Sequence, residues 1–280
     1  MSRLLSADLA RLRKSIFFKL CVIGMFLFGI YMKVMDYVSC TQYGFTVSLF
    51  SMLTIYMFVL VFMIPAFVSL FVGAEYSDGT IRNKLIIGHT RLSIYLSNLI
   101  TGVAAALIFT AAYLIAGLAV GIPLCGVSEA NYRELVSLFL LSIVTMTAIA
   151  SLSTLIGMLC QSRAVTAVVN ILAVLFLLVM SIYVSARLNE PEYYQSITTM
   201  TDDGSIQDVA EEKNPTYLRG TERKVYEFFN EFIPTSQAVA ITQGSVSDYS
   251  SVARMAGYSA GIAVVSTAVG IFVFRRKDIK

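Results

Sequence analysis

The chain has 280 residues, of which 57% are hydrophobic and only 14% are charged, and its mean hydropathy is +0.74. Soluble domains carry about 25% charged residues, so this composition excludes an ordinary globular protein. It predicts one integral membrane domain over residues 1–280. The net charge of +3 is small, and we expect no nucleic-acid partner.

The first segment, Ser2–Arg13, is predicted to be an amphipathic helix on the inner membrane surface, in contact with membrane lipid. Its leucines fall close to one helical face: Leu4, Leu5, Leu9 and Leu12. The alternative is a positively charged flank that precedes the first span.

Six stretches are long and apolar enough to cross a bilayer, so we expect an all-α integral membrane protein with six transmembrane helices. Lys19 and Lys33, near the ends of the first, are expected to snorkel to the interface. The span centres carry no ionisable residue, which argues against a proton-driven carrier. The spans are predicted at Ile16–Met35, Phe45–Val72, Leu92–Ile122, Leu135–Leu159, Ala164–Ser185 and Met255–Phe274.

Basic residues gather on one side of these spans, which predicts that both termini are cytoplasmic, because Lys and Arg accumulate in cytoplasmic flanks. Six spans return the chain to the side where it started. The residues on that side are Arg3, Arg11, Arg13, Lys14, Lys19, Arg82, Lys84, Arg91, Arg163, Arg275, Arg276, Lys277 and Lys280.

A short polar island, Gly73–Lys84, interrupts the apolar sequence between the second and third spans. Gly79 permits a sharp turn, and Asp78 or Thr80 is expected to cap a short helix there. The mixed charges indicate a docking surface for another protein, whereas the plain alternative is a solvated loop. The candidate docking residues are Glu75, Asp78, Gly79, Thr80, Arg82, Lys84 and Arg91.

Polar residues inside the spans give weaker signals. Thr147, Ser151 and Thr154 in the fourth span and Asn170 in the fifth are candidates for lining a translocation path, or for hydrogen bonds between helices. Small residues at Gly117-x-x-x-Gly121 and Gly257-x-x-x-Gly261 allow close helix contact.

The segment 186–254 is predicted to be an extracellular insertion, with helical pieces at Ile206–Lys213 and Thr221–Ile233. In the second piece Phe228, Phe229 and Phe232 share one apolar face, which either packs on the outer ends of the spans or contacts substrate above an exit path. Cys40 and Cys125 both fall on the outer side, where they could form a disulfide.

Catalytic motifs are absent from the sequence. It contains no P-loop, no H-E-x-x-H zinc motif and no G-x-S-x-G nucleophile elbow. The one histidine, His89, is expected to be a solvated loop residue. We therefore expect neither an enzyme nor a metal site, and no cofactor bound by this chain.

The polar island resembles the cytoplasmic coupling segment of type-2 ATP-binding-cassette exporter permeases. Those proteins show an acidic residue, a short gap and Gly-Thr before a basic stretch, which here are Glu75, Gly79-Thr80 and Arg82 to Lys84. The six-span plan and the large outer segment before the last span fit as well. Further resemblance to bacterial members is carried by Asn214-Pro215-x-Tyr217, Gly220-Thr221-x-Arg223-x-Val225-Tyr226, Pro234-Thr235-x-Gln237 and the basic tail Arg275-Arg276-Lys277-Asp278.

The resemblance implies a multi-pass permease of the bacterial cell membrane that pairs with a second permease, identical or related, and with separate ATPase subunits. Those subunits would use ATP and Mg²⁺ and would dock on residues 73–91. The uncharged spans favour an apolar or amphipathic cargo, such as a drug, a lipid-like molecule or an antimicrobial peptide. Two other classes remain open at this point, a channel without an ATPase and a non-transporting membrane sensor or scaffold.

Overall fold

The computed structural model describes residues 1–44, 53–125, 132–160, 162–194, 198–200, 206–208, 212–244, 246 and 248–277. Its body is all-α, and six of its helices are long and apolar enough to cross a membrane. These six are α2 (Ile16–Tyr43), α3 (Tyr56–Ser77), α5 (Arg91–Cys125), α6 (Tyr132–Cys160), α7 (Arg163–Leu188) and α10 (Tyr249–Arg276). The prediction of six spans is confirmed. The start predicted for the second span lies partly outside the described residues, and α3 itself begins at Tyr56.

Shorter elements complete the chain. Helix α1 covers Ser2–Lys14, α4 covers Thr80–Ile86, α8 covers Gly220–Phe232 and α9 covers Pro234–Gln243. Two small antiparallel ladders join β1 (Tyr193–Tyr194) to β4 (Glu212–Lys213) and β2 (Thr198–Met200) to β3 (Ile206–Asp208). The helix expected over Ile206–Lys213 is therefore wrong. Its described residues pair as strands instead, β3 with β2 and β4 with β1, and only Ile206 among them is apolar, so they offer no apolar stripe to bury as a helix.

The amphipathic helix expected at the start of the chain is present as α1. It turns into α2 at Ser15, whose side chain accepts a hydrogen bond from the Phe18 amide at 3.4 Å. Its inward face carries Leu4, Asp8 and Leu12, which are all buried. These positions are four apart, so they lie on one side of the helix.

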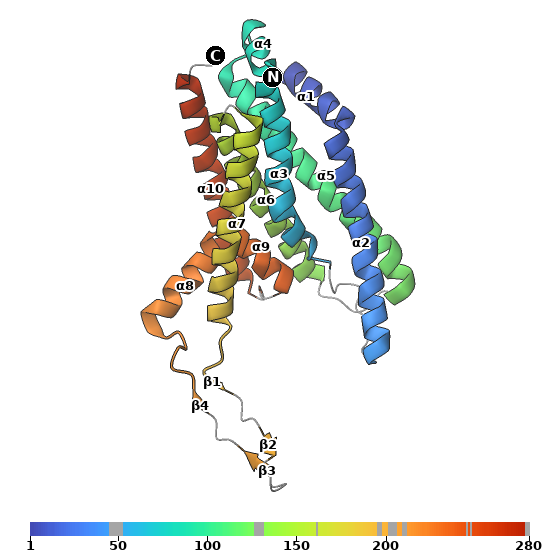
Figure 1. Ribbon diagram of the computed structural model, residues 1–280, viewed down its shortest axis with the longest axis vertical. Coiled ribbons are helices and arrows are strands. Elements are labelled where there is room, and N and C mark those ends of the chain that lie inside the picture. The colour runs from blue at the N-terminus through green and yellow to red at the C-terminus, as the bar shows by residue number, and fades with distance from the viewer. Residues whose placement is uncertain are drawn as a thin grey trace.

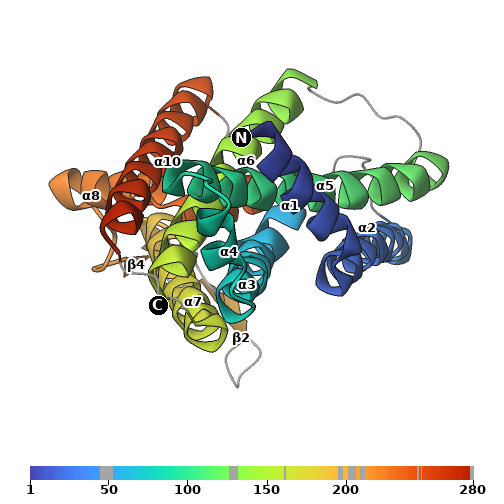
Figure 2. The same cartoon turned by 90° about the horizontal axis from the view of Figure 1, so that it is seen from above.

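Helix α3 lies at the centre of the bundle and is the most buried span. Figures 1 and 2 show it between α2 and α5 on one side and α7 on the other. Its residues Met57, Leu60, Val61, Ile64 and Val68 belong to the main apolar core. The core therefore lies around α3.

Close approach of α2 and α5 depends on Gly29. A Cβ atom at this position would lie 2.5 Å from the Tyr113 carbonyl oxygen and 3.1 Å from the Ala116 Cβ. Since backbone atoms cannot move aside, only glycine allows this crossing. Gly117 of α5 faces the same contact and would place a Cβ 4.0 Å from the Gly29 oxygen.

Both termini lie at one end of the bundle, together with α1 and α4, and we call this the termini end (Figure 1). Helices α8 and α9 and the four strands lie toward the opposite end, which we call the far end. The helix expected over Thr221–Ile233 is confirmed as α8. Its bounds differ slightly, because Arg219 precedes the helix where Thr221 was expected to cap it.

One expectation for α2 is wrong. Lys33 does not snorkel, because its side chain is only 1% exposed and its Nζ lies 3.2 Å from Asp36 Oδ2. Helix α2 continues eight residues past Met35, to Tyr43, so Lys33 and Asp36 pair within one helix rather than at its end. Cys40 is a free thiol with Sγ 3.9 Å from Asp36 Oδ1, and the side chain of Cys125, its possible disulfide partner, lies outside the described part of the structure.

Candidate functional site

The polar island contains a short helix, α4, which leaves the bundle at the termini end (Figure 1). Gly79 starts it with a φ of +66°, a left-handed conformation that suits glycine, as the sequence predicted. Neither Asp78 nor Thr80 caps the helix with its side chain, contrary to expectation. The turn at Gly79 leaves seven residues in α4, a length that is stable only through contacts with the rest of the fold.

Lys84, on the inner side of α4, provides the main contact. Its Nζ donates to Asp8 Oδ1 of α1 at 2.8 Å and also to Glu75 Oε1 of α3. Arg11 of α1 adds a second cation, with Nη1 2.7 Å from the same Glu75 oxygen. We call Asp8, Arg11, Glu75 and Lys84 the charge cluster. It joins three helices that meet only at this end of the molecule.

Helix α5 completes the hydrogen bonding of the two carboxylates. Ser97 Oγ donates to Asp8 Oδ2 at 2.6 Å, and Asn98 Nδ2 donates to Glu75 Oε2 at 2.8 Å. Every oxygen of both carboxylates therefore has a donor. Burying ions is costly unless they are paired and hydrogen-bonded, and these are both, so the cluster fixes the positions of α1 and α4 relative to α3 and α5.

Burial separates the candidate docking residues into two groups. Glu75 and Lys84 are buried in the charge cluster, so their charges do not reach a surface that a partner could touch. Asp78 and Arg82 are exposed, while Gly79 and Thr80 are half-buried. Next to Arg82, Ile86 and Ile87 are 73% and 77% exposed at the tip of the helix. The surface open to a partner is thus Arg82 with an apolar tip.

Arg91 has a different place. It begins α5, and its Nη1 donates to the carbonyl oxygens of Phe274, at 2.6 Å, and of Lys277. A cation at the carboxyl end of a helix is favoured by the helix dipole and by the unpaired carbonyls there. Arg91 therefore ties the first turn of α5 to the last turn of α10 rather than lying on α4.

The candidate path residues all make hydrogen bonds within the bundle. Ser151 of α6 pairs with Ser266 of α10 at 2.7 Å, and Asn170 Nδ2 of α7 donates to Ser69 Oγ of α3 at 2.7 Å. Thr147 and Thr154 donate to carbonyls one turn back on their own helix. Of the two uses predicted for these residues, Ser151 and Asn170 show the second, hydrogen bonding between helices.

Gln237 of α9 forms a polar centre at the far end. The sequence analysis named it only as part of a motif of the resemblance and predicted no role for it. Its Oε1 accepts from Thr145 Oγ1 and Ser259 Oγ, each at 2.7 Å. Its Nε2 donates to the carbonyls of Glu231 and Met255 at 2.7 and 2.9 Å. One fully buried amide thus joins α6, α8, α9 and α10, and it uses all the bonds that a glutamine can make. We call it the glutamine centre.

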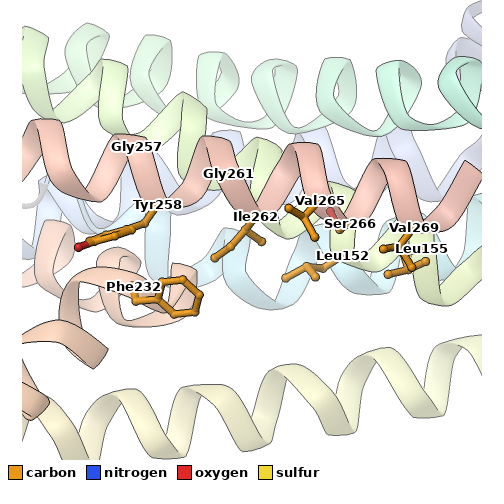
Figure 3. A pocket seen from close by; sticks show the side chains of 10 residues that line it. All are labelled: Leu152, Leu155, Phe232, Gly257, Tyr258, Gly261, Ile262, Val265, Ser266 and Val269. Carbon is orange, nitrogen blue, oxygen red and sulfur yellow. The ribbon is translucent and has the colours of Figure 1, made fainter.

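An apolar groove of about 510 Å³ runs along α10 between α6 and the end of α8 (Figure 3). Phe232 and Tyr258 lie at one end of it, and their ring centroids are 5.7 Å apart. Gly257 and Gly261 keep it open, since no atom lies within 4 Å of a Cβ added at either position. These glycines therefore bring no helices together in the described chain, unlike Gly117. The groove could hold an apolar chain.

The face of α8 that carries Phe228, Phe229 and Phe232 is only half-covered. Phe228 and Phe232 lie against Tyr258 of α10, with ring centroids 5.8 and 5.7 Å away, and Tyr226 lies near Tyr183 of α7. The helix thus packs on the far ends of two spans, while its phenylalanines border the groove.

The described residues contain no group of three or more His, Cys, Asp or Glu side chains able to hold a metal ion.

Asp8, Ser97 and Asn98 were missed by sequence reasoning. A signal existed for Asp8, because it lies midway between two leucines of the buried face of α1.

No protein-family model and no curated protein matches the chain.

Proposed function

We propose that this chain is the membrane-spanning subunit of an ATP-driven exporter and that a separate ATPase subunit docks on α4. The observation that carries the proposal is the construction of α4. Its outer side offers Arg82, Ile86 and Ile87 to a partner, while its inner side is fixed to the span helices through Lys84. A solvated loop would need no such attachment.

The charge cluster supplies a route for motion. A displacement of α4 by the partner would also displace Lys84. The ion pairs of Lys84 with Asp8 and Glu75 would then move α1 and α3 together with α4. Ser97 and Asn98 hold the same two carboxylates and so draw α5 along. ATP binding and hydrolysis in the partner would in this way change the arrangement of two spans, α3 and α5, together with α1, as a rigid-body transition does elsewhere. ATP and Mg²⁺ belong to the partner.

The cargo is proposed to be apolar or amphipathic, such as a drug, a lipid-like molecule or a membrane-active peptide. The groove along α10 supports this, because its lining is almost entirely apolar with hydroxyls only from Ser266 and Tyr258. The proposed exporter is a pair of permeases in the bacterial cell membrane, with termini cytoplasmic. The excess of Lys and Arg at the termini end supports that orientation.

The test is affinity purification of the tagged chain from its native host, followed by mass spectrometry and an ATPase assay. We expect a soluble P-loop protein to accompany the chain and to be lost from the Arg82→Glu/Ile86→Asp variant. The matched control is Lys224→Glu, which reverses an exposed charge on α8 at the far end and should retain the partner. Recovery of the chain alone in several detergents would contradict the proposal and favour a pore or scaffold.

A further inference from the structure

A second cavity lies at the termini end, beside Arg11 of the charge cluster. It has a volume of about 280 Å³ and is bordered by α1, the first turn of α2, α3 and the start of α7. Its upper part is formed by Arg11, Lys14, Arg163 and Asp78, and its lower part by Phe17, Phe67, Leu70 and Phe71. The cavity is therefore charged at one end and apolar at the other.

The charged end has an excess of positive charge that the chain does not satisfy. Three cations face one carboxylate, and in the described part of the chain neither Lys14 nor Arg163 has a carboxylate within ion-pair distance. Arg11 pairs with Glu75 through Nη1, but its buried Nε and Nη2 have no partner among the same residues. Lys14 and Arg163, by contrast, are exposed on the cavity lining, and their uncompensated charges favour a negatively charged ligand there.

Aromatic rings hold the arginines at the rim. Arg11 Cζ lies 3.8 Å from the centre of the Phe71 ring, and Arg163 Cζ lies 5.7 Å from that of Phe17. Stacking of this kind limits the positions of long side chains and leaves their N–H groups available. Gly73 lets α7 begin close to α3, since a Cβ there would lie 2.8 Å from Arg163 Cα. Both arginines are thus brought to the same opening.

The dimensions fit an amphiphile that enters from the membrane. Along α3 the lining extends from Phe67 to Asp78, which is about 16 Å at 1.5 Å per residue. This is enough for a headgroup at the charged end and the first part of an acyl chain beside Phe67 and Leu70. Basic pockets between spans at a membrane surface are known to take anionic lipid headgroups.

We propose that this cavity binds one anionic phospholipid from the adjoining leaflet, with its phosphate among Arg11, Lys14 and Arg163 and an acyl chain against Phe67 and Leu70. The lipid would fix the junction of α1 and α2 to the start of α7. The proposal does not depend on the exporter assignment, because the ligand is a membrane component and binds to this chain alone.

The test uses the purified full-length chain in neutral detergent, titrated with dioleoyl phosphatidylglycerol and read by native mass spectrometry. Lys14→Gln/Arg163→Gln should weaken the one-to-one adduct about thirtyfold, given roughly 1 kcal/mol for each basic residue near an anionic lipid and about 1.4 kcal/mol for each factor of ten in affinity. The matched control is Arg13→Gln/Arg275→Gln, which removes the same charge from exposed positions that do not border the cavity. It should bind as the unchanged chain does. Equal weakening in both variants, or none in either, would overturn the site.

Two further arms identify the source of the phosphate. Leu70→Asn should weaken phosphatidylglycerol binding, while dioleoyl phosphatidylcholine should bind poorly to every variant. Inorganic phosphate at millimolar concentration should not displace the lipid. Complete displacement by inorganic phosphate, or no effect of Leu70→Asn, would mean that the cavity takes a free anion and would overturn the lipid assignment.

Discussion

At the termini end the helices are joined through ionised side chains, whereas at the far end they are joined through a neutral amide. The charge cluster connects α1, α3 and α4 by way of Asp8, Glu75 and Lys84. The glutamine centre connects α6, α8, α9 and α10 by way of Gln237. Asp8, Glu75, Lys84 and Gln237 are all buried, and every carboxylate oxygen of the first two and both amide atoms of Gln237 have hydrogen-bond partners.

The difference lies in what happens when one partner is removed. Losing one ion from a buried pair leaves an uncompensated charge, whereas losing a neutral amide leaves only unpaired dipoles. Removing one member of the charge cluster is therefore expected to cost more stability than removing a neutral hydrogen-bonding group, and such a cluster holds α4 strictly in one position relative to α1 and α3. A neutral centre is suited to a fixed part of the framework. This contrast predicts a ranking of variants.

The largest effect is expected for Lys84→Met. It leaves Asp8 without a cation, and the free energy of unfolding should fall by about 3–5 kcal/mol, the range measured for one-sided loss of a buried ion pair. Thermal unfolding of the purified chain in detergent measures this. Arg82→Met, an exposed position on the same helix, should change stability by less than about 0.5 kcal/mol. If the two variants had the same melting temperature, the charge cluster would not stabilise the fold in the way predicted.

A double variant refines that prediction. Asp8→Asn together with Lys84→Met removes one charge of each sign, so it should be less damaging than Lys84→Met alone. The coupling between the two positions should be in the range of about 0.5–3 kcal/mol that contacting residues show. Strictly additive losses would show that Asp8 and Lys84 do not interact.

A smaller effect is expected for Gln237→Leu. Two hydroxyls and two carbonyls lose their partner, but all are neutral, so the loss of stability should be about 1–3 kcal/mol. Gln243→Leu is the matched control in α9, because its residue is exposed and accepts one hydrogen bond, from Ser185 at 3.1 Å. If Gln237→Leu proved more damaging than Lys84→Met, the contrast between the two ends would be reversed.

The smallest effect concerns the loop that follows α7. A hydrogen bond from Arg187 lowers the pKa of Glu190 below its ordinary value of 4.5, with further bonds from Thr216 and Asn214. A depressed pKa means that this contribution to stability is complete above the ordinary value and is lost as pH falls through the lower value of the folded loop. The protection of the Asn214 and Thr216 backbone amides from exchange, relative to the intrinsic exchange rate at each pH, should therefore fall only in that acid range. Glu190→Gln should abolish the pH dependence, and an unchanged profile would contradict it.

Hydropathy predicted the six spans because burial in lipid is a property of each segment taken alone. The turn at Gly79 and the helix α8 were predicted for the same reason, since both follow from local sequence. Partners distant in sequence were not predictable. Nothing near Glu75 or Lys84 shows that both point inward toward Asp8, and Lys33 was assigned to the interface because its pairing with Asp36 required α2 to extend past Met35. The short strands were missed because each is only two or three residues long, too short for an alternating pattern to be recognised.

The separation of Asp8 from Lys84 has a consequence for biogenesis. The two residues are 76 positions apart, so at roughly 5–20 residues per second the ribosome needs about 4–15 s to make the second after the first. During that interval α1 has no cation from α4 to hold Asp8. Its amphipathic character suits it to the membrane surface until α3 and α4 have been made. Helix α1 thus precedes in synthesis the cation that Asp8 binds in the folded chain.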